Sequence, residues 1–134
     1  MAVAPVLDSY ALLAFLRGEP GEEKVTALLE RAGERDQSVH MTEANYAEVK
    51  YITVRKDGVK RWEQIAHELR ALPIEFHPID RNLADLAADF KARYKISLAD
   101  AFAAALAKER KAELVTGDPE FADLESEIKI VWMT

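Results

Sequence analysis

Short apolar segments alternate with longer amphipathic segments along this chain, and the alternation limits the folds that it can adopt. Five short segments are predicted to be strands, at residues 3–7, 38–41, 74–77, 113–115 and 128–132. Helices are predicted at residues 9–17, 22–32, 43–56, 60–71, 81–94 and 97–107, with a short helical turn at 119–124. Strands that are nearly all apolar are typical of parallel sheets covered by helices on both faces. The pattern therefore predicts an α/β fold with a parallel sheet.

Length and composition narrow the class of protein further. The 134 residues contain no long linker, so we expect residues 1–134 to form one domain with a substantial core. The absence of cysteine excludes disulfides and thiolate metal sites. We find neither a signal peptide nor a membrane span in the sequence and expect a cytoplasmic protein. A net charge of −6 argues against loose polyanion binding, so a nucleic-acid partner requires a local basic patch or metal ions at an acidic site.

The helix predicted at residues 97–107 is apolar nearly all round and consists mainly of small side chains. Such a helix is expected to be buried, and its small side chains allow other backbone to approach closely. Asp100 lies in its first turn, where an acid on an interior helix needs a specific reason.

Three further acids map to the same edge of the predicted sheet. Asp8 follows the first strand and Asp118 follows the fourth, and ligands of open parallel sheets bind beyond the carboxyl ends of the strands. Glu48 lies one turn into the helix after the second strand, within a largely apolar stripe, and is expected to point inward. Together with Asp100 these residues predict an acidic cluster.

Each acid also has a purely structural interpretation. Asp8 and Asp118 are suitable helix N-caps, and Asp100 with Ser97 resembles a capping box. Glu48 could pair with a basic residue on its own helix. For any single acid the structural interpretation is at least as good as the functional one, but the coincidence of four at one edge favours a site.

Electrostatics indicates what such a cluster would do. Two carboxylates about 4 Å apart repel by about 4 kcal/mol at an effective dielectric constant of about 20. Several together must bind protons or recruit cations, and oxygen ligands without nearby His or Cys suit Mg²⁺ or Mn²⁺. One or two such ions could activate water for phosphodiester hydrolysis. The sequence supplies neither a nucleophilic triad nor a glycine-rich phosphate loop.

The acids lie in four short motifs: Val6-Leu7-Asp8-Ser9, Asn45-Tyr46-Ala47-Glu48-Val49, Ser97-Leu98-Ala99-Asp100-Ala101 and Thr116-Gly117-Asp118-Pro119-Glu120-Phe121. In this order and spacing they span almost the whole chain. The pattern resembles the PIN-domain ribonucleases, and specifically the VapC-type toxins of toxin–antitoxin pairs.

The resemblance implies a metal-dependent endoribonuclease with a three-layer α/β/α fold, usually a homodimer that a cognate antitoxin protein silences. It further implies that an acidic cluster holds Mg²⁺ or Mn²⁺, formed by Asp8, Glu48, Asp100 and Asp118. The small polar residues expected to orient these carboxylates are Ser9, Asn45 and Thr116. Tyr10 departs from the family pattern, in which a small polar residue is more usual, and this puts the local substrate contacts in question.

A basic segment is the best candidate for contact with RNA phosphates. Five basic residues and one acid, Asp57, give this segment a local charge of +4; the basic residues are Lys50, Arg55, Lys56, Lys60 and Arg61. A solvated face between two helices explains the same residues equally well. The three histidines have no metal-ligand spacing and are assigned packing or surface roles; they are His40, His67 and His77.

Two other classes of protein, the phosphoaspartyl phosphatases and the receiver domains, also place acids at the carboxyl edge of a parallel sheet, but their patterns are not met here. A phosphoaspartyl phosphatase requires a second Asp where Tyr10 stands, and a receiver domain requires a lysine after the last strand, where Trp132, Met133 and Thr134 follow instead. The remaining alternative is a non-catalytic PIN-like domain that binds partners. Four intact acids argue against it, because a degenerate site is expected to lose some of them.

Overall fold

A parallel sheet of five strands forms the centre of the computed structural model, which describes residues 3–134. The strands are β1 (Val6–Leu7), β2 (Val39–Thr42), β3 (Ile74–His77), β4 (Leu114–Thr116) and β5 (Ile130–Trp132). They lie in the order β3-β2-β1-β4-β5, and every neighbouring pair is parallel. The first strand of the chain is therefore the central one, and the prediction of a parallel sheet is confirmed.

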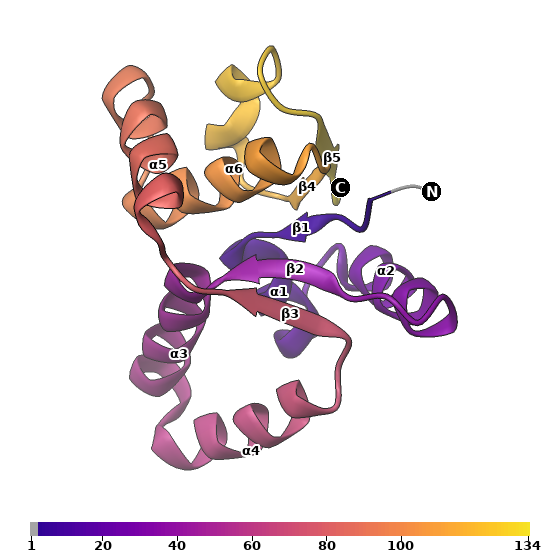
Figure 1. Ribbon diagram of the computed structural model, residues 1–134. Coiled ribbons are helices and arrows are strands. Elements are labelled where there is room, and N and C mark those ends of the chain that lie inside the picture. Colours follow the sequence, from indigo (N-terminus) through magenta and orange to yellow (C-terminus); the bar gives the residue numbers. More distant parts are fainter. Residues whose placement is uncertain (1–2) are drawn as a thin grey trace.

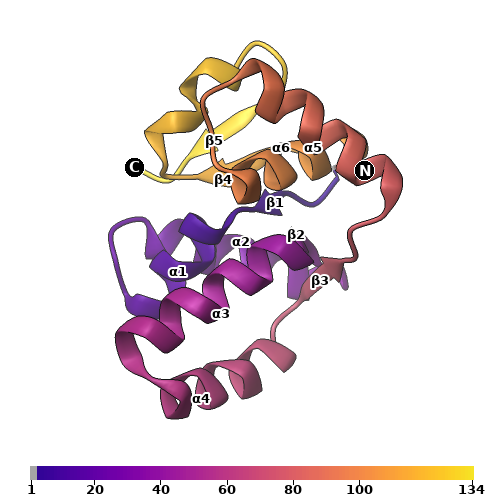
Figure 2. The same cartoon turned by 90° about the vertical axis from the view of Figure 1, so that its left-hand side faces the viewer.

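Helices cover both faces of this sheet, as Figures 1 and 2 show. On one face lie α1 (Ser9–Arg17), α2 (Glu22–Glu34), α3 (Glu43–Asp57) and α4 (Val59–Arg70), and on the other lie α5 (Arg81–Arg93), α6 (Leu98–Arg110) and the 3-10 helix η1 (Pro119–Leu124). Successive strand residues point to opposite faces. Val6 and Leu114 thus join the core beneath α5 and α6, whereas Leu7 and Val115 join the core beneath α1 to α4. This is the predicted three-layer α/β/α arrangement.

The helix α6 is buried along most of its length, as its composition predicts. Ser97 caps its first turn by accepting a hydrogen bond of 3.1 Å from the Asp100 backbone N–H. Its alanines are buried from Ala103 to Ala107, and they let α6 lie close to α5, α3 and the sheet. Lys111 ends the helix in the left-handed conformation, with φ of 53°. The helix is thereby fixed in the position that carries Asp100 to the carboxyl edge of the sheet.

The structure corrects several predicted boundaries. The first strand begins at Val6 instead of Val3, because Pro5 has no N–H to donate and Val3 is 48% exposed. β2 and β4 each start and end one residue later than predicted, and β5 starts at Ile130 because Ile128 still bonds back to Leu124 of the preceding turn. α1 and η1 keep their predicted bounds, and the ends of the other helices differ from the predictions by at most three residues. Within residues 3–134 no helix has the length and apolar character needed to span a bilayer.

Candidate active site

Asp8 is completely buried directly after the central strand, and both of its carboxylate oxygens are engaged. Oδ1 accepts a hydrogen bond of 2.8 Å from the Ala11 N–H, which makes Asp8 the N-cap of α1. Oδ2 accepts one of 2.5 Å from the Thr116 hydroxyl at the end of β4. Burial raises the pKa of Asp8 to about 7 against these two hydrogen bonds, and the charges of Asp100 and Asp118 raise it further. The capping role and a place in the acidic cluster therefore coexist in this residue.

Three more carboxylates meet beside Asp8. Oxygens of Asp100, Asp118 and Glu120 all lie within 4.8 Å of one another. Burial raises the pKa of Asp100 to about 6, and the negative charges of Asp118, Glu48 and Glu120 add to the increase. Asp118 also accepts a hydrogen bond of 2.9 Å from the Glu120 N–H and caps η1, as predicted.

Glu48 approaches the cluster from α3, on the opposite side of the sheet edge. It is half-buried, so the expected inward direction holds only in part, and its charge contributes to the raised pKa of Asp100. The Tyr51 hydroxyl donates a long hydrogen bond of 3.5 Å to Glu48 Oε2. The structure thus brings all four acids of the sequence prediction to one region.

Glu120 is the acid that the sequence analysis missed. It is exposed in the first turn of η1, two residues after Asp118, and Pro119 between them starts this turn. The available signal is the spacing, because the tight turn after an Asp-Pro cap returns the second acid toward the first.

A buried polar network links the elements that carry the acids. Asn45 on α3 donates to Ser9 Oγ at 3.0 Å and to the Ala99 carbonyl at 3.2 Å, and it accepts from the Thr42 hydroxyl at 2.5 Å. Ser9 in turn donates to the Asn45 carbonyl at 3.3 Å. Ser9 and Asn45 therefore join α1, α3 and the first turn of α6, whereas Thr116 contacts the carboxylate of Asp8 itself.

Tyr10, the departure noted in the sequence, lies against the loop between Thr116 and Asp118. A Cβ atom on Gly117 would come within 2.3 Å of Tyr10 Cε1, so only glycine fits beneath this ring. The Tyr10 side chain remains 47% exposed. It thus forms an aromatic surface next to the acidic cluster.

The donor set of the cluster fits a small hard cation. All the converging groups are carboxylates. Burial and the neighbouring negative charges raise the pKa values of Asp8 and Asp100, so the ionised cluster is unfavourable without a cation. Mg²⁺ and Mn²⁺ prefer oxygen ligands of this kind, and a bound cation would favour the ionised carboxylates.

The predicted basic residues are divided between two helices and do not share one environment. Arg55 lies over the Tyr51 ring at 5.1 Å, on the same stripe of α3 as Glu48, whereas Lys50 lies 6.0 Å from the Trp62 ring on α4. The exposed members also include Lys56 and Lys60. Arg61 is half-buried and pairs with Glu68 at 3.9 Å. Arg55 is connected to the acidic cluster through Tyr51, because its guanidinium lies over the Tyr51 ring and the Tyr51 hydroxyl bonds to Glu48.

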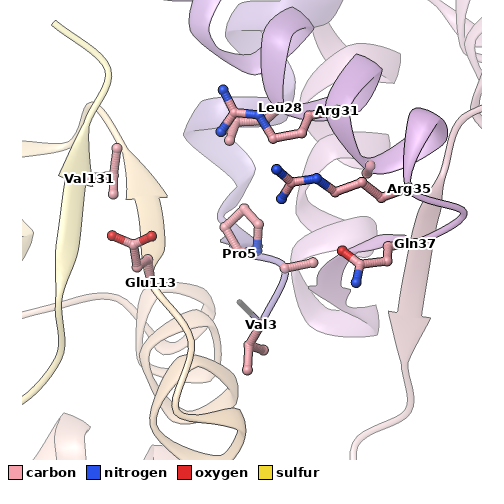
Figure 3. A pocket seen from close by; sticks show the side chains of 10 residues that line it. Val3, Pro5, Leu28, Arg31, Arg35, Gln37, Glu113 and Val131 are labelled. Carbon is pink, nitrogen blue, oxygen red and sulfur yellow. The ribbon is translucent and has the colours of Figure 1, made fainter. Parts of the chain in front are cut away.

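A cavity of about 110 Å³ lies at the opposite, amino edge of the sheet. Figure 3 shows Arg31 of α2 and Arg35, which follows α2, on one side of it and Glu113, which precedes β4, on the other. Pro5, which precedes β1, also lines the cavity. The cavity is therefore separated by the length of the strands from the acids at the carboxyl edge.

The fold and the cluster together define an α/β domain whose acids converge at the carboxyl edge of a parallel sheet. The sequence model of the family described as PIN domain matches residues 6–127. The chain belongs to the PIN domain family, and the resemblance drawn from its four motifs is confirmed. No curated protein matches the chain significantly.

Solved structures with the same fold come from several bacteria. The chain is similar to one in "Crystal structure of VapBC2 from Rickettsia felis bound to a DNA fragment from their promoter", with a TM-score of 0.75, 12% identity and coverage of 94% of this chain and 96% of that one. A chain of DNA-bound VapBC from Salmonella typhimurium gives 0.73, 15% identity and complete coverage of both. One of FitAcB from Neisseria gonorrhoeae gives 0.67, 21% identity and coverage of 96% of each chain. At these identities the similarity establishes the fold.

Proposed function

We propose that this protein is a metal-dependent endoribonuclease and the toxin of a toxin–antitoxin pair. The observation that carries the proposal is the convergence of Asp100, Asp118 and Glu120 within 4.8 Å beside the buried Asp8. Membership of the PIN domain family supports it. An acidic cluster that is costly to maintain without a cation is best explained by a reaction that uses one.

The residues around the cluster would hold the metal ions and orient the carboxylates that bind them. Asp100, Asp118 and Glu120, with Asp8 and Glu48 around them, would hold one or two Mg²⁺ or Mn²⁺ ions. A bound ion would supply a water activated for attack on phosphorus and stabilise the departing oxygen. The hydrogen bond from Thr116 favours the ionised form of Asp8, and the network of Ser9 and Asn45 holds α1, α3 and α6 in register.

RNA would approach the cluster along α3. Tyr51 is 47% exposed and contacts Glu48, and Arg55 lies over the Tyr51 ring. A phosphate bound by Arg55 would place the adjoining nucleotide near the acids, with the ring of Tyr51 available for stacking. Lys50, Lys56, Lys60 and Arg61 are proposed to add weaker attraction for phosphates.

The proposed partners are a cognate antitoxin and a second copy of this chain. Similar chains were solved in the VapBC complexes of Rickettsia felis and Salmonella typhimurium, and another in a "Toxin-antitoxin complex from Klebsiella pneumoniae". The similarity to these complexes supports an antitoxin partner. The homodimer and the cytoplasmic location are part of the same proposal. A non-catalytic interaction domain is the competing function, and it gives no reason for the raised pKa values of Asp8 and Asp100.

The deciding experiment is cleavage of RNA by the purified protein with Mg²⁺ or Mn²⁺, with EDTA, and with the variant Asp100→Asn. We expect cleavage that EDTA abolishes and that Asp100→Asn lowers by about 100-fold or more, the scale for loss of one essential stabilising group. Asp123→Asn is the matched control, because Asp123 is an exposed acid of η1 outside the cluster. Cleavage that survives both EDTA and Asp100→Asn would exclude the metal mechanism.

A further inference from the structure

Two histidines that are 37 residues apart in the sequence meet on neighbouring strands of the sheet. His40 of β2 is paired in register with Glu75 of β3, and Thr42 is paired with His77. Parallel partners point to the same face, so His40, Glu75 and His77 all project on the side of α5 and α6. The Nδ1 atom of His40 lies 2.9 Å from Nε2 of His77. The same Nε2 atom lies 3.3 Å from Oε2 of Glu75.

We propose that His40, Glu75 and His77 form a binding site for a divalent transition-metal ion of the Zn²⁺ class. Their three ligand atoms lie within 4.8 Å of one another. In a tetrahedral site with metal–ligand bonds of about 2.0–2.1 Å, ligand atoms are separated by about 3.3 Å. The observed separations of 2.9 and 3.3 Å need only a small opening of the histidine pair to reach that geometry.

The ligand chemistry separates this site from the acidic cluster. Two imidazole nitrogens and one carboxylate oxygen suit Zn²⁺ and its neighbours in the first transition row, whereas carboxylates alone suit Mg²⁺ or Mn²⁺. Three protein ligands leave a fourth position, which water would occupy. The proposal therefore concerns a different ion at a different place in the sheet and does not rest on the nuclease function.

The surroundings leave the site both prepared and accessible. His40 is buried, whereas His77 is half-buried and Glu75 is exposed, so an ion can enter from solvent along the edge strand β3. Neutral imidazole is the form that binds metals. Without metal, the two rings share a hydrogen bond in which the N–H of one ring is the donor and the bare nitrogen of the other is the acceptor. On binding, His77 would keep its proton on Nδ1 and present the Nε2 lone pair to the ion.

A metal at this position would fasten the edge of the sheet. β3 is the outermost strand beside β2, and two of the three ligands belong to it. The ion would thus tie β3 to β2 through side chains in addition to the strand hydrogen bonds.

The test is a calorimetric titration of Zn²⁺ into the full-length, metal-free protein, with excess Mg²⁺ present to occupy the acidic cluster. We expect one tight equivalent of Zn²⁺. Loss of a direct ligand is expected to exceed the 10–100-fold cost typical of an outer partner, so His77→Gln should weaken Zn²⁺ binding by more than about 100-fold. Glu75→Gln removes an exposed ligand with little risk to the fold and should weaken binding by at least about 10-fold.

His67→Gln is the matched control, because His67 is exposed on α4, away from the other two histidines, and should leave Zn²⁺ affinity unchanged. Circular dichroism of each metal-free variant checks that it is folded. Bound Co²⁺ should give the visible absorption of a tetrahedral site in the wild type and lose it in Glu75→Gln. Equal Zn²⁺ affinity of the wild type and His77→Gln, or no tight equivalent in excess Mg²⁺, would overturn the proposal.

Discussion

The Thr116 hydroxyl donates a hydrogen bond of 2.5 Å to Oδ2 of Asp8 and so joins the carboxyl ends of β4 and β1. This bond lowers the pKa of Asp8 against the effect of burial, and the remaining pKa is about 7. Thr116 thus controls how much of Asp8 is ionised at neutral pH, although the hydroxyl itself carries no charge.

Thr116→Val should raise the pKa of Asp8 above its present value of about 7. Because a cation binds the ionised carboxylate, Mn²⁺ affinity at pH 7 should fall and should recover when the pH is raised. Titration of Mn²⁺ between pH 6 and about 9 measures this shift. Thr116→Ser keeps the hydroxyl and should retain the wild-type profile; a parallel loss at every pH in both variants would contradict the role assigned to the hydrogen bond.

The stability of the metal-free protein should contain a contribution from Asp8 that decreases as the pH rises. The folded-state pKa of about 7 exceeds the ordinary value of 3.8 for an aspartate, so between these pH values the folded chain holds more protons than the unfolded one. The free energy of unfolding therefore falls through this window, by on the order of 4 kcal/mol for a shift of three units. Urea unfolding in EDTA at pH 5 and pH 8 measures the part of this decrease that lies above pH 5, which is about 2.7 kcal/mol at about 1.36 kcal/mol per pH unit.

Asp8→Asn isolates this contribution. His40 has a lowered pKa and acts with the opposite sign below about pH 6.5, but its contribution is common to both proteins and cancels in the comparison. The variant should lose less stability than the wild type between pH 5 and pH 8, and Mg²⁺ should stabilise the wild type more at pH 8 than at pH 5. Identical pH dependence of the free energy of unfolding in the two proteins would show that the pKa of Asp8 is not raised in the folded state.

Gly117→Ala should displace the Tyr10 ring, because the added Cβ would lie 2.3 Å from Tyr10 Cε1. Overpacking of this kind typically costs about 1–3 kcal/mol. Tyr10→Ala removes the obstacle, so the double variant should be more stable than the two single effects predict when added together. A thermodynamic cycle of the four proteins measures this coupling, and additive effects would mean that the ring moves freely.

Asn45→Ala should destabilise the fold by about 1–3 kcal/mol, since it leaves the Ala99 carbonyl and the Ser9 hydroxyl without their present partner. Urea unfolding of the variant measures the loss. Asn82→Ala, which removes an exposed hydrogen bond to Glu109, is the control and should change stability by much less. A similar small loss in both would indicate that water replaces the Asn45 contacts.

The acids could be predicted from the sequence because the physics that places them is local. Asp8 directly follows β1 and Asp118 comes two residues after β4, and the carboxyl ends of parallel strands meet at one edge. Asp100 was identifiable because an acid is rare in a helix of small apolar residues. Glu120 was missed although the turn at residues 119–124 was predicted, because the closeness of its carboxylate to that of Asp100 depends on how this turn packs beside α6.

The pairing of His40 with His77 could not be predicted in this way. Spacing within one segment reveals ligands on the same helix or strand, but these residues belong to different strands. Their contact depends on the register of β2 against β3, which the apolar pattern of either strand leaves open. The histidines have no metal-ligand spacing along the chain, as predicted, and their packing or surface roles stay a prediction, but the strand register brings His40 and His77 together.

The central position of β1 also bears on how the protein is made. β1 precedes the other four strands in the described sequence, yet it lies beside β4, and the bond between Asp8 and Thr116 spans 108 residues. A growing chain therefore carries Asp8 and Glu48 long before Asp118 and Glu120 exist. The complete cluster can form only after the chain has emerged as far as Glu120, so the proposed nuclease activity would be withheld until that point of synthesis.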